Sequence, residues 1–129
     1  MTGLSIIRVT LPWPPKGLRP NSRASHWAAH HRAFKAHKFA CIKACWAAGL
    51  IRKIDWAALH VQLVFHPPPD GQARDMDNMM AAMKAGIDAI AHVTGIDDRL
   101  WDPLSARGEP VKGGAVLALL SPHPFGDQQ

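Results

Sequence analysis

Two aspartates in the segment Arg74-Asp75-Met76-Asp77-Asn78 have the type and spacing that a shared divalent cation requires. Carboxylates at positions i and i+2 lie on the same side of an extended chain. Mg²⁺ prefers such hard oxygen ligands and keeps several of its water molecules. The alternative is that Asp77 caps the following helix while Asp75 is simply solvated. The segment by itself therefore predicts either a cation site or a helix cap.

A second acidic pair, Asp97-Asp98, follows Gly95-Ile96. Adjacent carboxylates repel each other unless a cation or solvent relieves them, so a buried pair would imply a metal and an exposed pair would mean little. Asp75, Asp77 and Asp98 together supply the three carboxylates that a Mg²⁺-dependent phosphodiesterase needs. Such a metal activates water and neutralises the charge that builds on the phosphate oxygens.

A helix over residues 78–93 is expected to connect the two acidic segments. At about 100° per residue, its apolar residues fall on one face, the expected core stripe: Met79, Met83, Gly86, Ile87 and Ile90. Asp77, Lys84 and Asp88 fall on the opposite face. Helical side chains lean toward the N-terminus, which would bring the Lys84 ammonium toward the carboxylates. The alternative role for Lys84 is an ordinary i,i+4 ion pair with Asp88.

Charge divides the chain in two. The formal net charge is +5, and residues 1–54 hold ten Lys or Arg and no Asp or Glu. All ten acids lie in residues 55–129. A long helix over residues 24–49 is expected to bury an apolar stripe of Trp27, Phe34, Cys41, Cys45 and Ala48, with Arg32, Lys35 and Lys43 roughly opposite. This pattern favours a polyanionic partner, although an uneven, solvated surface would carry the same charges.

The expected elements occur in the order βαβαββ. Strands are expected at residues 4–11, 57–66, 104–109 and 114–121, with a hairpin turn at residues 111–114 (VKGG) between the last two. This order predicts a single two-layer α/β (α+β) domain over residues 1–121, in which two main helices pack on a mixed sheet. Residues 122–129 are expected to form a flexible tail. Cys41 and Cys45 are expected to be reduced and buried, because four helical positions suit a disulfide poorly.

No stretch approaches the roughly 20 apolar residues that span a bilayer, and no signal-peptide pattern precedes the first strand. A cytoplasmic protein is therefore expected. No Gly-rich phosphate-binding loop is present, which argues against an NTPase and against a nucleotide cofactor. No Ser/His/Asp arrangement favours acyl-transfer chemistry.

The string DMDNMMAAMKAGIDAI followed by GIDD resembles the pattern of the RusA-like Holliday junction resolvases, which are crossover junction endodeoxyribonucleases. The N-terminal LPWPPKGLRPNSR and the following His-Trp resemble the opening of phage-type members of that family. Arg107, VKGG and a last strand also fit. The resemblance covers about residues 5–121.

This resemblance implies a Mg²⁺-dependent homodimer, with Mn²⁺ able to replace the metal, that resolves four-way DNA junctions in recombination and repair. By position, Asp75, Asp77 and Asp98 would be the catalytic, metal-binding carboxylates, and Lys84 would be the helix lysine near the active site. Lys84 follows Asn78 at an interval one helical turn longer than in the enterobacterial prototype, so it matches less closely than the aspartates do.

Several residues are expected to contact the DNA backbone or an opened base: Lys16, Asn21, Arg23, His26, Arg32, Lys35, Arg74 and Arg107. Two other functions stay open. One is a basic DNA-binding module without catalysis, in which the aspartates only cap the helix and solvate the loop. The other is a zinc protein built on His26, His30 and His37, although residues 1–54 offer no carboxylate to complete such a site. Trp13 and Trp101 are expected to anchor the core or an interface.

Overall fold

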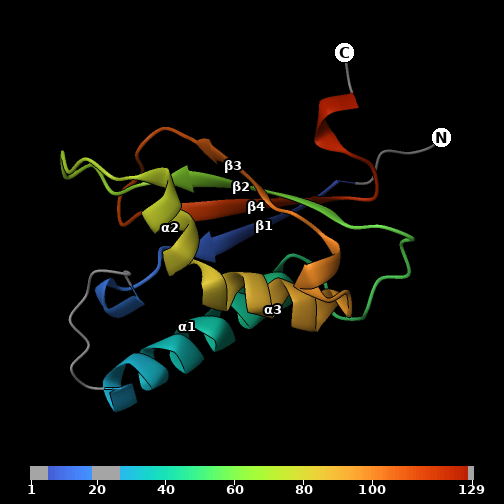
Figure 1. Cartoon of the computed structure of the whole chain (residues 1–129), viewed down its shortest axis with the longest axis horizontal. Coiled ribbons are helices and arrows are strands. Elements are labelled where there is room, and N and C mark those ends of the chain that lie inside the picture. The colour runs from blue at the N-terminus through green and yellow to red at the C-terminus, as the bar shows by residue number, and fades with distance from the viewer. Residues whose placement is uncertain (1–5, 19–26, 128–129) are drawn as a thin grey trace.

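The computed structural model describes residues 6–18 and 27–127 of the chain. A four-stranded sheet lies on one side of the molecule and the main helices lie on the other (Figure 1). The elements, in chain order, are β1 (Ile7–Pro12), η1 (Lys16–Leu18), α1 (Trp27–Ala47), β2 (His60–His66), α2 (Met76–Ala82), α3 (Lys84–Thr94), η2 (Asp98–Leu100), β3 (Leu104–Arg107), β4 (Ala115–Ser121) and η3 (Phe125–Asp127). The predicted mixed sheet and two-layer α+β class are confirmed.

The strand order in the sheet is β1-β4-β2-β3. Strand β4 runs antiparallel to both of its neighbours, β1 and β2, whereas β3 runs parallel to β2. Parallel neighbours need a crossover connection, and here α2, α3 and η2 supply it. The crossover therefore carries both acidic segments of the chain.

One face of the sheet forms the core. Its alternating buried side chains line up across strands β1, β4 and β2, in the rows Val9–Ala118–Leu63 and Leu11–Val116–Phe65. Helices α1 and α3 cover this face with Cys41, Cys45, Ile87 and Ile90, and Met83, between α2 and α3, is buried with them. All five members of the predicted core stripe, including Met79 and Gly86, are buried.

No α-helix among residues 6–18 and 27–127 covers the other face of the sheet (Figure 1). We call this the open face; it carries the half-buried side chains of Gln62 and Val64 on β2 and of Leu117 and Leu119 on β4. Its apolar residues belong to strands that are already fully paired.

The second predicted helix is interrupted at Met83, which divides it into α2 and α3 and leaves the predicted two-layer arrangement unchanged. Met83 has φ −93° and ψ 12°, and its N–H donates to the Met80 carbonyl, three residues back, at 3.1 Å. The side chain of Met83 is fully buried over Gly86, where a Cβ would fall 2.6 Å from Met83 Cε. The same Cβ would lie 3.5 Å from Cys41 Sγ. Close packing of α3 on α1 thus favours glycine here and accompanies the turn at Met83.

The predicted hairpin between the last two strands was also wrong. Residues 111–114 do form a turn, in which the Gly114 N–H donates to the Val111 carbonyl at 2.9 Å. However, β2 lies between β3 and β4 in the sheet. The local turn signal does not encode this insertion of β2, which pairs with both strands.

The first helix begins at Trp27 in the described chain and ends at Ala47, with Gly49 in the left-handed conformation (φ 95°) shortly after it. Two members of its predicted apolar stripe, Trp27 and Ala48, are exposed, so that part of the prediction was wrong. Buried His37 lies with Cys41 and Cys45 on the core side instead. The expected tail contains η3 up to Asp127. No helix in the part of the chain that the structure describes is long and apolar enough to cross a membrane.

Candidate active site

Asp75 is the N-cap of α2. Its backbone is extended (φ −83°, ψ 134°), and its Oδ1 accepts a hydrogen bond from the Asp77 N–H at 3.3 Å. Asp77 lies in the first turn of the helix, where a negative charge interacts favourably with the helix dipole. The cap is therefore Asp75 and not Asp77, and both carboxylates are exposed to solvent.

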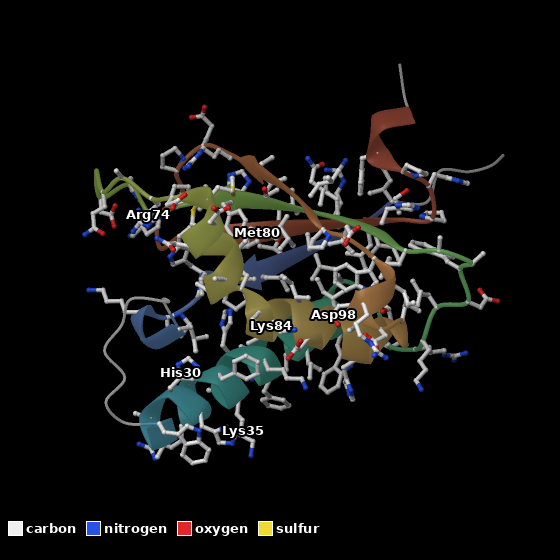
Figure 2. The ribbon with its side chains drawn as sticks, in the orientation of Figure 1. His30, Lys35, Arg74, Met80, Lys84 and Asp98 are labelled. Carbon is white, nitrogen blue, oxygen red and sulfur yellow. The ribbon has the colours of Figure 1, made fainter. Side chains whose placement is uncertain are left out.

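Lys84, the first residue of α3, lies between two carboxylates. Its Nζ is 3.0 Å from Asp88 Oδ1 and 3.1 Å from Asp98 Oδ2 (Figure 2). The hydrogen bonds to Asp88 and Asp98 raise the pKa of Lys84. The predicted i,i+4 pair with Asp88 is thus present, together with a contact to the second acidic segment that helix geometry alone does not predict.

The loop after α3 fixes Asp98 in place. Gly95 closes the helix in the left-handed conformation (φ 78°), which L side chains rarely adopt. The buried indole of Trp101 donates its Nε1–H to the Ile96 carbonyl at 3.1 Å, which anchors the loop to the core. This placement of Trp101 confirms its predicted role as an anchor.

The two members of the acidic pair have different partners. Asp97 caps η2, and hydrogen bonds from the Arg99 N–H and guanidinium lower the pKa of its carboxyl. Asp98, the next residue, faces Lys84. The pair is therefore not a buried, mutually repelling pair, and Asp98 alone lies toward the helix lysine.

The charged residues of the candidate site form two separate groups at opposite ends of α2. Asp75 and Asp77 lie at its start, and Lys84, Asp88 and Asp98 lie beyond its end. The rest of α2 and the interruption at Met83 separate Asp77 from Lys84 along the chain. Among residues 6–18 and 27–127, no three or more His, Cys, Asp or Glu side chains are close enough together to hold one metal ion.

Arg74, just before Asp75, is engaged within the protein. Its guanidinium makes two hydrogen bonds to Asp70, at 2.8 and 3.0 Å, and lies 5.5 Å from the centroid of the Trp13 ring. The side chain is only 12% exposed, and the ion pair holds the pKa of the Asp70 carboxyl well below its usual range. Because its guanidinium is occupied by Asp70 and Trp13, Arg74 is poorly placed to bind DNA phosphate. Its contacts instead stabilise the loop before Asp75.

A depression of about 320 Å³ adjoins Arg74. The expected DNA-contacting residue Lys16 lines it, together with Trp13, Asp70, Gln72 and Gly113. Trp13 also packs edge-on against buried Phe65, at 6.2 Å between ring centroids, which anchors the floor of the depression to the core.

The remaining expected DNA contacts are divided among several places. Arg32 and Lys35 are exposed on α1. Arg107 donates from Nη2 to the Arg74 carbonyl at 2.8 Å, so it braces the same loop. Asn21, Arg23 and His26 lie outside the described residues.

The histidines of α1 do not converge. The His30 ring bonds to the Gly17 carbonyl through Nδ1 at 3.1 Å, whereas His37 is buried with Nε2 3.7 Å from Cys41 Sγ. Burial lowers the pKa of His37. Of the three histidines considered for zinc, His30 thus connects α1 to η1, His37 packs in the core, and His26 lies outside the described residues.

Two features were missed from the sequence. The first is Asp70, whose partnership with Arg74 follows from an i,i+4 spacing that was available in the sequence. The second is a row of exposed aromatic and basic residues on α1. The row includes Trp27, which the helical periodicity wrongly placed in the core stripe.

No known protein-family profile matches the chain. The chain is similar to a protein of Xylella fastidiosa (strain Temecula1) described as "Uncharacterized protein", with 35% identity over 98 residues. The matched region covers 70% of this chain and 60% of the Xylella protein, so the chain spans less than two thirds of that relative's length.

Proposed function

We propose that the chain is a Mg²⁺-dependent endonuclease that cuts branched DNA, as its resemblance to RusA-like resolvases implies. One observation carries the proposal. A solvent-exposed lysine, Lys84, lies between Asp88 and Asp98, on the same crossover that presents Asp75 and Asp77 at its start. The crossover thus combines the Lys84 ammonium, which is suited to binding phosphate, with the Asp75 and Asp77 carboxylates, which are suited to binding a metal ion.

The donors fit a hydrated Mg²⁺ better than a closed protein cage. Asp75 and Asp77 are exposed carboxylates two residues apart, and Mg²⁺ is usually bound through one or two carboxylates, several waters and the substrate phosphate. Asp98, the third ligand that the resemblance implies, is paired with Lys84 in this structure. A bound Mg²⁺ would supply an activated water and neutralise charge on the scissile phosphate.

The protein's own groups have distinct tasks in this proposal. The hydrogen bond from the Asp77 N–H orients the Asp75 carboxylate. The Lys84 ammonium steadies the phosphate or the leaving oxygen, because a phosphate oxygen can take the place of one of its two carboxylate partners. Asp98 and Asp88 hold the Lys84 ammonium in place for that contact.

A homodimer would give the enzyme two such sites related by a two-fold axis, which matches the approximate two-fold symmetry of a four-way junction. The open face supports this part of the proposal, because it presents half-buried apolar residues without a covering helix in the described chain.

The test compares a labelled four-way junction with a linear duplex of equal length, with and without Mg²⁺. We expect paired, symmetric nicks near the branch point that require Mg²⁺, and much slower cutting of the duplex. Asp75→Asn, Asp77→Asn and Asp98→Asn should each lower the rate by about 100-fold or more while junction binding persists. Asp55→Asn, which alters an exposed aspartate outside the crossover, serves as the matched control. Wild-type rates in all three variants would refute the metal-site assignment.

The rival function is a basic DNA-binding module without catalysis. It is favoured by the structural roles of Asp75, which caps α2, and of Asp98, which pairs with Lys84. A module of this kind would bind the junction with a steep salt dependence and leave it intact in Mg²⁺.

A further inference from the structure

Six exposed side chains form a continuous row along α1. Four successive steps of four residues lead from Trp27 to Lys43, and a step of three then reaches Trp46. Such steps keep neighbours adjacent on a helix surface. We call the row the α1 ridge; its members are Trp27, His31, Lys35, Phe39, Lys43 and Trp46.

The ridge residues contact one another. The rings of Trp27 and His31 stack, with centroids 5.2 Å apart and planes 5° from parallel. Lys43 Nζ lies 5.0 Å from the centroid of the Phe39 ring, and the Phe39 and Trp46 rings meet edge to face at 6.5 Å. Aromatic surface and positive charge therefore alternate along the whole helix.

The aromatic rings of the ridge are not part of the core. Trp27 is 76% exposed, Phe39 is 53% exposed and Trp46 is 48% exposed. The helix contacts the core through other residues, among them Cys41 and Cys45. Leaving three large aromatic side chains in water forgoes the gain from burying them, which indicates that a partner covers them.

The positive charge of residues 1–54 indicates which kind of partner fits the ridge. Residues 1–54 contain no Asp or Glu, so nothing on this helix neutralises Lys35 and Lys43. A second copy of α1 placed on the ridge would bring lysines toward lysines without an acid between them. A polyanion with flat, apolar faces satisfies both kinds of residue, because its phosphates meet the lysines and its bases stack on the rings.

We propose that the α1 ridge binds unpaired, single-stranded DNA. Bases inside a duplex are stacked on one another and cannot reach the rings, whereas an unpaired strand exposes a flat face on every base. The 19 residues between Trp27 and Trp46 span about 28 Å, which is long enough for several nucleotides. Helix α1 packs against α3, which begins at Lys84, through its core-facing side, and in Figure 2 the ridge residue Lys35 lies on the side of α1 away from Lys84 and Asp98. The choice of DNA as the nucleic acid rests on the proposed function.

The test measures binding in EDTA, where no cleavage occurs, with a fluorescent oligo(dT) strand and a duplex of equal length. Phe39→Leu with Trp46→Leu keeps apolar bulk but removes the aromatic faces. We expect single-strand affinity to fall about five- to 100-fold in this double variant and duplex affinity to change less than about two-fold. Phe39→Trp should retain wild-type affinity. The matched control is Ile51→Ala, which truncates a 68% exposed apolar side chain outside the ridge.

Three results would overturn the proposal. The first is wild-type single-strand affinity in the double leucine variant. The second is an equal loss of affinity for single-stranded and duplex DNA in that variant, which would mean that the rings do not stack on unpaired bases. The third is a shift from dimer to monomer on sedimentation with DNA affinity unchanged, which would assign the ridge to a second copy of the chain. Asp75→Asn separates this proposal from the proposed function, because it should lose cleavage and keep single-strand affinity.

Discussion

The Lys84 ammonium lies 3.1 Å from the Asp98 carboxylate, although 14 residues separate the two along the chain. The contact bridges the start of α3 and the start of η2. It brings together the helix lysine and one member of the acidic pair, two features that the sequence presents as separate motifs.

Lys84→Gln tests whether this contact serves chemistry or only stability. Exposed ion pairs contribute about 0–1 kcal/mol, so the variant should lose about 1 kcal/mol of unfolding free energy or less. If the ammonium steadies the phosphate, junction cleavage should fall by about 100-fold or more, the loss typical of a group that stabilises charge in the transition state. Thermal unfolding and a cleavage time course are the two measurements.

Asp88→Asn is the control for Lys84, because it removes the partner at 3.0 Å and leaves the ammonium in place. It should have a similar small effect on stability and change cleavage less than about five-fold. Equal losses of activity in Lys84→Gln and Asp88→Asn would give the lysine a structural role only.

The open face is the expected dimer surface. Leu117→Lys places a charge among its half-buried apolar side chains, and a charge buried without a partner is costly. We expect this variant to sediment as a folded monomer and to lose paired nicking while retaining the far-UV circular dichroism of the wild type.

Ser105→Lys introduces the same charge on the opposite side of the same sheet. Ser105 lies opposite Leu63 in the β2–β3 register and is exposed at the edge strand. This variant should remain dimeric. A dimeric Leu117→Lys protein would exclude the open face as the interface.

The two cysteines predict an alkaline loss of stability. Burial raises the pKa of Cys41 to about 12 and that of Cys45 to about 11, from 9.0 for a free thiol. Because folding favours the protonated thiols, this contribution is complete below pH 9 and is lost as the pH rises from there toward these values. Each thiol can remove up to about 1.4 kcal/mol per pH unit over that interval.

Chemical denaturation at pH 8 and at several pH values above 9 measures this loss, and the Cys41→Ala/Cys45→Ala protein should show a shallower decline. At pH 8 both thiols should resist iodoacetamide in native buffer and react in denaturant. Rapid native alkylation would contradict the buried, protonated state.

Patterns local in sequence gave reliable predictions for this chain. The alternation in β2 and the periodicity from Met79 to Ile90 gave correct buried faces, because side-chain period alone determines which residues share a face. The order of strands and helices also gave the correct class. Of the acidic residues, the spacing of Asp75 and Asp77 identified a helix start, although the cap is the first residue and not the second.

Features that depend on distant residues were not predictable. The turn at Met83 accompanies packing between Gly86 and Cys41 on different helices. The separation of β3 from β4 depends on β2, more than 40 residues earlier in the chain. The contact between the Arg74 guanidinium and the Trp13 ring forms because the fold brings the segment after β1 next to the loop before α2. Each of these features depends on a tertiary contact between residues far apart in the sequence.

The central position of β4 has a consequence for how the chain is made. Ribosomes release the N-terminal strands first, yet within residues 6–18 and 27–127 β1 pairs in the sheet with β4 alone, and β2 lacks its antiparallel neighbour until the same strand emerges. The backbone N–H and C=O groups of β1, and those on the β4 side of β2, must therefore stay unpaired until the last strand of the sheet is synthesised. Nascent chains in this state are candidates for chaperone binding, and folding should be slow for so small a domain because its decisive pairings are all non-local.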